Sequence, residues 1–210
     1  MKKIELIEET LEELFPNPKC ELNYNKDYEL LICVMLSAQT TDKRVNEVSK
    51  VLFSKYPTLF DIKNANIDEL KNILMPLGNY NKKAIYVKEI ASTLVDKYNR
   101  KMPINRKALE NLKGVGRKTV NVVFSELKIE DNIAVDTHVE RVSKRLSLAK
   151  KEDSVLEVEK HLRRKFKKNT WNKRHLQLVL FGRYYCKAIK PKCDNCKLKE
   201  ICSYYKKGEL

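Results

Sequence analysis

The sequence predicts an all-α fold. Apolar residues recur at helical spacing along almost the whole chain of 210 residues, and the alternation typical of strands is essentially missing. Proline and glycine fall between the helical stretches, where a helix cannot easily continue. With 42% hydrophobic residues, the chain can bury one large core or two small ones.

The predicted helices follow one another with short connectors. The first contains an apolar stripe that should face a core, formed by Ile4, Ile7, Leu11 and Leu14. Further helices are predicted over residues 27–38, 42–55, 67–74, 81–98, 106–112 and 117–127, with three more before the C-terminal cysteines. Segment 29–36 is apolar nearly all round, as expected of a helix buried in the centre of a bundle.

The formal net charge is +15, from 43 Lys and Arg against 28 Asp and Glu. Residues 161–174 contain seven Lys or Arg and no acid, and residues 97–118 contain eight with the single acid Glu110. One explanation of the high net charge is that the chain is lysine-rich throughout. The clustering favours a face that binds a polyanion, with nucleic acid as the leading partner.

The hydropathy of the chain predicts a cytoplasmic protein. No apolar run is long enough to span a membrane, and acids stand near the N-terminus where a signal peptide needs an apolar stretch. For a protein that binds DNA, this implies association with the nucleoid.

Residues 112–119, with the sequence LKGVGRKT, place two glycines between predicted helices. Gly114 and Gly116 permit a tight turn with positive φ and exposed backbone N–H groups, which can hold a phosphate. Lys113 and Arg117 add positive charge beside that turn. The pattern is that of a helix-hairpin-helix, which grips the DNA backbone without reading its sequence. A helix-capping glycine followed by an ordinary turn is the alternative.

Lys118 is the candidate nucleophile of this segment. It stands at the start of a predicted helix among other cations, and both features disfavour the charged form of its amine. A neutral amine is what Schiff-base chemistry requires. From the residues alone, however, a plain phosphate contact is the simpler explanation of Lys118.

Asp136 is the candidate acid. Thr137 and Glu140 have the spacing of a capping box, so Thr137 is expected to cap the next helix and to leave Asp136 available. A carboxylate just ahead of a helix can stabilise positive charge that develops on a sugar ring. The alternative is that Asp136 is itself the N-cap. His138 is expected to be a structural residue or a phosphate neighbour.

Four of the six cysteines lie within seventeen residues near the C-terminus, at Cys186, Cys193, Cys196 and Cys202. They are not scattered as in a disulfide framework, and their thiolates can close either a tetrahedral zinc site or a four-iron cluster. From the Cys-x-x-Cys core alone, zinc is the safer assignment. Lysines between these cysteines indicate that the metal also fixes a loop against phosphates.

Taken together, four features resemble the endonuclease III family: LSAQTTD at residues 36–42, LKGVGRKTVNVV at 112–123, VDTHVERVSKRL at 135–146, and the cysteine spacing. The resemblance runs almost from end to end. It implies a six-helix barrel domain with the helix-hairpin-helix over residues 22–130. It also implies a discontinuous iron-sulfur cluster domain formed by residues 1–21 and 131–210, with a DNA-binding cleft between the two domains.

The resemblance also assigns roles to residues. Lys118 would be the nucleophile, Asp136 its carboxylate partner, and Gln39 would fill the gap left by an extruded nucleotide. The residues expected to contact DNA are Gln39, Leu77, Asn79, Lys113, Gly114, Val115, Gly116, Arg117 and His138. The metal prediction moves from zinc to a 4Fe-4S cluster, which would be structural and would face DNA.

Two positions depart from the family pattern. Lys113 replaces a proline that usually precedes the glycines, which exchanges turn rigidity for a charge near phosphate. Asn79 stands where the family often has leucine, in a loop whose apolar side chains wedge into the duplex. The second departure bears on base flipping and on opposite-base preference.

The function implied is that of a bifunctional DNA glycosylase and abasic-site lyase of base excision repair. Such an enzyme excises oxidised pyrimidines through a lysine Schiff base and cleaves the strand 3′ to the abasic site by β-elimination. Its partner would be double-stranded DNA with damaged bases or abasic sites, for which a monomer suffices. Mismatch glycosylases of the same superfamily would lack Lys118, whereas a non-catalytic DNA-binding protein and a zinc-binding module remain alternatives.

Overall fold

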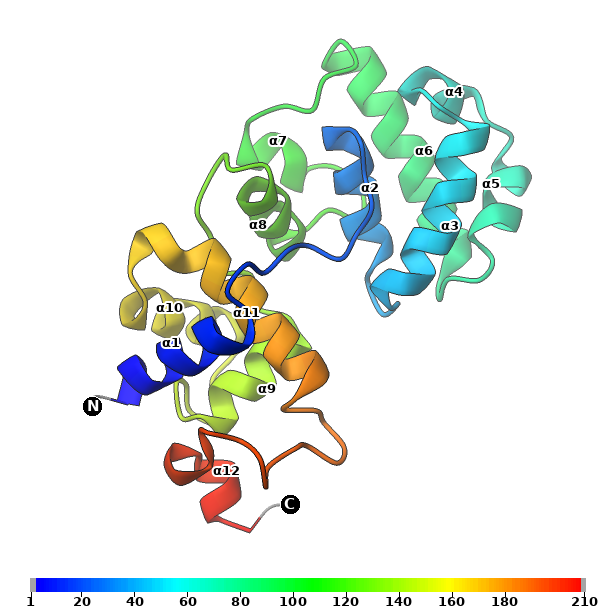
Figure 1. Cartoon of the computed structure of the whole chain (residues 1–210). Helices are drawn as coiled ribbons and strands as arrows, with labels where there is room; N and C mark the ends of the chain where they lie inside the picture. Colours follow the sequence, from blue (N-terminus) through cyan, green and yellow to red (C-terminus); the bar gives the residue numbers. More distant parts are fainter. Residues whose placement is uncertain (1–2, 209–210) are drawn as a thin grey trace. The chain divides into compact units, whose positions relative to one another are not determined.

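The computed structural model describes residues 3–208, and across these residues it is all-helical, with no strand (Figure 1). The predicted all-α fold is therefore confirmed. The α-helices are α1 Lys3–Leu14, α2 Asp27–Leu36, α3 Asp42–Lys55, α4 Leu59–Asn64, α5 Ile67–Leu74, α6 Tyr80–Lys97, α7 Arg106–Glu110, α8 Arg117–Glu126, α9 Thr137–Arg145, α10 Val155–Lys165, α11 Trp171–Tyr184 and α12 Ser203–Lys206. Two short 3₁₀ helices cover Lys168–Thr170 and Lys199–Ile201.

Two compact units make up the chain. One spans Glu21–Val123, and the other combines the N-terminal residues up to Cys20 with those from Phe124 onward. The second boundary cuts α8, whereas the sequence placed it at residue 130. The ends of the discontinuous domain, residues 1–2 and 209–210, lie outside the described residues. The division into functional domains remains a prediction.

In the unit Glu21–Val123, α2 is the buried helix. Every residue from Tyr28 to Leu36 is buried, Glu29 included, and the apolar residues on nearly all sides of this helix leave it little surface suited to water. Helices α4 and α5 both pack against α6 (Figure 1). Side-chain caps fix where the neighbouring helices begin: Thr41 accepts the backbone N–H of Arg44 before α3, and Asn66 caps α5.

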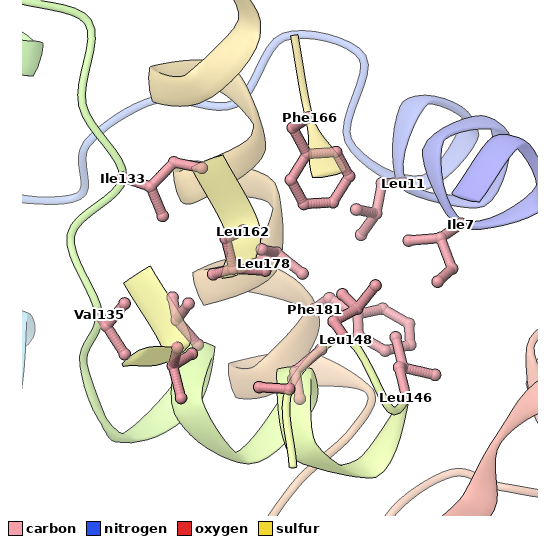
Figure 2. Packing of buried hydrophobic residues seen from close by; sticks show 14 of the residues in the cluster. Ile7, Leu11, Ile133, Val135, Leu146, Leu148, Leu162, Phe166, Leu178 and Phe181 are labelled. Carbon is pink, nitrogen blue, oxygen red and sulfur yellow. The ribbon is translucent and has the colours of Figure 1, made fainter. Parts of the chain in front are cut away.

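The other unit is built around a cluster of buried side chains from α1, α9, α10 and α11 (Figure 2). Ile7 and Leu11 of α1 are fully buried in this cluster, and Ile4 and Leu14 pack against it. The predicted apolar stripe of the first helix is therefore confirmed. Burying one such side chain contributes about 1.5–3 kcal/mol, so this cluster holds the N-terminal helix against segments more than 100 residues later in the chain.

Polar contacts add to the attachment of α1 to α11. Glu12 of α1 accepts hydrogen bonds from Arg174 Nη1 and Gln177 Nε2, each at 3.1 Å, and it also pairs with Lys173. Gln177 also donates to the carbonyl oxygen of Phe15 at 2.9 Å. Part of the basic segment 161–174 is thus used inside the fold.

Two helices were not predicted from the sequence. Helix α4 has six residues, and α12 has four. Helix α4 nevertheless has a complete capping box between Thr58 and Asp61, which is the sequence signal that could have found it. Within residues 3–208, no helix combines the length and the apolar character that crossing a membrane would require.

Candidate functional site

The glycine hairpin lies between α7 and α8. The backbone N–H of Val115 donates to the carbonyl oxygen of Leu112 at 3.1 Å, and both side chains are buried. Gly114 has a φ of +76°, in the left-handed region that residues with a Cβ rarely adopt. Gly116 does not have a positive φ. The positive φ that the sequence allowed at both glycines is therefore used only at Gly114.

The cations of the hairpin are exposed. Helix α8 begins at Arg117, so Lys118 stands in its first turn, with Lys113 just before the glycines. The side chains of all three cations are exposed. The backbone N–H groups of the first turn and the positive end of the helix dipole are both at the N-terminus of α8, where these cations also lie. This arrangement suits the binding of a phosphate and presents the Lys118 amine to solvent.

A second group of polar side chains lies in the same unit. Gln39 and Asn79 are both exposed, and both have a left-handed φ, of +56° and +57°. The amide Nδ2 of Asn79 donates to Oε1 of Gln39 at 3.3 Å. Leu77 is only 1% exposed, because an apolar side chain gains stability when it leaves water. The contact of Leu77 with DNA that the resemblance implies remains a prediction.

Asp136 is the N-cap of α9. Its Oδ1 accepts the backbone N–H groups of His138 at 2.9 Å and of Val139 at 2.8 Å. The prediction that Thr137 caps this helix is wrong, because Thr137 is already the first helical residue. A carboxylate in this place accepts two otherwise unpaired backbone donors and lies at the positive end of the helix dipole. Capping therefore fixes the orientation of the candidate catalytic acid.

His138 packs closely against α11. A Cβ built on Gly182 would lie 2.9 Å from the Cβ of His138, so only glycine permits this approach. Burial lowers the pKa of His138, and the nearby charge of Asp136 opposes this effect. The contact of His138 with DNA remains a prediction.

Arg141 is a residue that the sequence analysis missed. Its Nη2 donates to the carbonyl oxygen of Gly182 at 2.8 Å, and its Nε donates to that of Cys186 at 3.1 Å. The same Nη2 lies 3.2 Å from Nδ1 of His138. Nothing in the local pattern of the sequence distinguishes this arginine from its basic neighbours, because its acceptors lie more than 40 residues later.

The four C-terminal cysteines, Cys186, Cys193, Cys196 and Cys202, line one small cavity. Burial and the neighbouring thiols raise the pKa of Cys193, and burial raises the pKa of Cys196. Within residues 3–208, no three His, Cys, Asp or Glu side chains meet closely enough to form a metal-binding group as they stand.

Arg145 contacts this cysteine group from α9. Its Nη1 donates to Sγ of Cys186 at 3.4 Å and to the carbonyl oxygen of Lys187 at 2.7 Å. Its own carbonyl oxygen accepts from Sγ of Cys202 at 3.4 Å, and its guanidinium lies 3.8 Å from the ring centroid of Tyr204. Arg145 was also not identified from the sequence.

Comparison with known proteins shows which family this chain belongs to. Residues 32–168 match the HhH-GPD superfamily of base excision DNA repair proteins. The chain is 44% identical to endonuclease III of Bacillus subtilis, over 96% of this chain and 92% of the relative. It is 42% identical to endonuclease III of Haemophilus influenzae, over 100% of this chain and 98% of the relative. The chain belongs to the endonuclease III family.

A solved structure of this family supports the same assignment. It describes a trapped covalent intermediate of endonuclease III with DNA, an estranged-adenine complex. The fold matches that structure with a TM-score of 0.94 and 43% identity over 100% of both chains. Family membership confirms the resemblance on which the roles of the site residues were predicted, whereas the roles themselves remain predictions.

The cysteine group fits the cofactor expected of the endonuclease III family. Four thiols that share one cavity provide the sulfur ligands that a 4Fe-4S cluster needs. Four thiolates that line one cavity would repel one another, so a cationic metal centre is the partner that lets them ionise together. The donor from Arg145 to Cys186 is the kind of second contact that orients a metal ligand.

Proposed function

We propose that this chain is a bifunctional DNA glycosylase and abasic-site lyase of base excision repair, acting on oxidised pyrimidines. The observation that carries the proposal is Lys118, exposed in the first turn of α8 directly after the glycine hairpin. A covalent intermediate with DNA is described for the family member that this fold matches with a TM-score of 0.94. Such an intermediate requires a nucleophile, and an amine at this place can supply it.

The proposed substrate is double-stranded DNA that contains a damaged base or an abasic site. Backbone N–H groups of the hairpin, together with Lys113 and Arg117, would bind phosphates without reading sequence. Gln39 would fill the gap left by the extruded nucleotide. Extrusion costs a few kcal/mol and costs least for a damaged base, which contributes to selectivity. A single copy of the chain contains all of these groups, so we expect a monomer to act.

In the proposed reaction, the neutral amine of Lys118 attacks the sugar C1′. The bond between C1′ and the damaged base breaks, and the base leaves with the bonding electrons. The carboxylate of Asp136 would stabilise the positive charge that develops on the sugar. Opening of the sugar ring gives a Schiff base, and loss of a C2′ proton then expels the 3′ phosphate, which cleaves the strand on the 3′ side.

Cys186, Cys193, Cys196 and Cys202 would hold the proposed 4Fe-4S cluster. When bound, the cluster would stabilise the C-terminal segment and fix its lysines for contact with phosphates. The reaction itself is carried by Lys118 and Asp136.

The proposal is tested by trapping the Schiff base. The protein is incubated with a duplex that contains one thymine glycol, and borohydride is added to reduce any imine to a stable amine. We expect a covalent protein–DNA complex with the unaltered chain and none with Lys118→Gln. Lys113→Gln is the matched control, because it removes a charge from the same hairpin and leaves the nucleophile in place.

The outcomes distinguish a lyase from a DNA-binding protein that has no catalytic activity. A complex that forms with Lys113→Gln but not with Lys118→Gln supports the lyase. Tight binding of the duplex without any trapped complex would overturn the enzymatic proposal and leave a sequence-independent DNA-binding protein.

A further inference from the structure

Lys83, in the first turn of α6, is a buried lysine whose side chain no part of the proposed chemistry uses. It is 4% exposed, and burial lowers its pKa. Its ammonium donates to the carbonyl oxygen of Ala38 at 2.9 Å and to Oγ1 of Thr40 at 3.0 Å. Both acceptors are neutral, so the desolvation of this ammonium is not offset by a carboxylate at either contact.

The two acceptors flank Gln39. One hydrogen bond reaches the residue before Gln39 and the other reaches the residue after it. Gln39 itself has a φ of +56°, a conformation that is unfavourable for a residue with a Cβ unless its surroundings hold it. The ammonium of Lys83 is therefore placed to hold the turn that presents Gln39 to solvent.

The same lysine also contacts the other exposed residue of this group. Its backbone N–H donates to the carbonyl oxygen of Asn79 at 3.0 Å, and the side chain of Asn79 donates to that of Gln39. Asn79 also has a left-handed φ, of +57°. The backbone bond to Asn79 is one that any residue at this place in the helix would make, whereas the bonds to Ala38 and Thr40 depend on the ammonium of Lys83.

We propose that Lys83 is a positioning residue that holds Gln39 ready to enter the duplex in place of an extruded nucleotide. The inference rests on the proposed function, because it gives Lys83 a task in base extrusion. Lys83 acts through the backbone and hydroxyl on either side of Gln39. Without it, the turn relaxes from its left-handed conformation, the gap in the duplex is filled less often, and the damaged base returns to the stack.

The test replaces Lys83 with methionine, which keeps an unbranched apolar side chain and removes the donors. Lys88→Met is the matched control, because Lys88 is on the same helix and its Nζ donates to the carbonyl oxygen of Ala65 at 2.6 Å, away from Gln39. Two quantities are measured for each variant: single-turnover excision of thymine glycol, and fluorescence of 2-aminopurine placed opposite an abasic-site analogue. Thermal melting of each variant reports its folding.

We expect Lys83→Met to slow excision by about tenfold, as displacement of a positioned group does, and to lower the 2-aminopurine signal. Lys88→Met should stay within about twofold of the unaltered chain. In a chain that already contains Gln39→Ala, Lys83→Met should cause no further loss, since a residue that acts through Gln39 has nothing left to position. A merely structural role would instead lower the melting temperature and slow excision in both backgrounds.

Thr40→Val provides a second variant if Lys83→Met does not fold, because it removes one acceptor and leaves the lysine in place. It should reproduce a part of the loss. The inference is overturned if the unaltered chain excises thymine glycol and folded Lys83→Met or Thr40→Val does so equally well, or if the losses from Lys83 and Gln39 multiply independently. Absence of excision by the unaltered chain would overturn the proposed function as well.

Discussion

The ring of Tyr86 lies so close to Gly114 that a Cβ on the glycine would be 2.5 Å from Cδ2 of Tyr86. Tyr86 belongs to α6 and Gly114 to the hairpin, so this contact joins the hairpin to the longest helix of its unit. The φ of +76° at Gly114 is a second and independent reason for glycine. Gly116, two residues later, has open space where its Cβ would be.

This contrast predicts different outcomes for alanine at the two glycines. Gly114→Ala should destabilise the unit by about 1–2 kcal/mol from the left-handed conformation alone, and by more from the contact with Tyr86. Gly116→Ala should cost about 1 kcal/mol or less. Because its hairpin is displaced, the Gly114→Ala variant should also bind an undamaged duplex about tenfold more weakly than the unaltered chain does. Chemical denaturation measures the loss of stability, and fluorescence anisotropy measures the loss of DNA binding. Equal losses of stability in the two variants would contradict the conclusion that only Gly114 needs to be glycine.

A second variant separates the two causes at Gly114. Tyr86→Ala, added to Gly114→Ala, removes the ring that the new Cβ would meet but leaves the unfavourable φ. It should therefore restore only a part of the lost stability. Full restoration would show that the backbone conformation contributes nothing.

The local pattern of the sequence predicted the helices well wherever a cap and an apolar stripe occur together. Residues 42–55 and 67–74 were predicted with the boundaries that α3 and α5 have, and the structure shows that Thr41 and Asn66 cap these two helices. Helix α4 was missed because six residues are too few for a periodic pattern, although its capping box is present. Long segments with caps are predictable, and very short helices depend on their neighbours.

The site was predictable as a set of residues, and less so as a set of contacts. The sequence allows either Asp136 or Thr137 to be the N-cap of the next helix. Only the observed start of α9 at Thr137 shows that the cap is Asp136. Lys83 has the spacing of an ordinary surface lysine, and its acceptors lie more than 40 residues earlier in the chain. Contacts of this kind depend on how helices pack, which local spacing does not record.

The capping role of Asp136 predicts that its asparagine and alanine variants differ in stability but not in activity. Asparagine caps a helix about as well as aspartate, whereas alanine at this position costs about 1 kcal/mol. Both variants lose the negative charge, so excision should slow by about a hundredfold to a thousandfold in each. Binding of an abasic-site duplex should persist. Thermal melts and single-turnover kinetics test this, and an active Asp136→Asn would remove Asp136 from the mechanism.

The lowered pKa of Glu12 predicts that the stability of the fold depends on pH. Hydrogen bonds from Lys173 and then Gln177 lower its pKa to about 2, from 4.5. A carboxylate with a lower pKa in the folded state stabilises the fold above its unfolded pKa, and this contribution is lost as pH falls from 4.5 towards 2. Glu12→Gln should therefore lower the urea midpoint at pH 7, and the difference should shrink below pH 4.5.

Glu13→Gln is the control for this prediction. Glu13 pairs with Lys197, and both side chains are about 60% exposed, so the pair is screened by solvent. Its loss should leave the urea midpoint unchanged within error. A difference for Glu12→Gln that stayed constant down to pH 3 would show that packing, rather than charge, accounts for its effect.

The cysteine cavity predicts a brown protein that contains iron and inorganic sulfide in equal amounts. Cys193→Ser should lose the visible absorbance and most of the iron, because a cluster held by four thiolates depends on each of them. It should also melt at a lower temperature, since a bound structural metal centre contributes directly to folding. Cys20→Ser is the matched control, as Cys20 does not line the cavity. A colourless protein that contains one zinc per chain would instead favour the tetrahedral site that the cysteine spacing also allows.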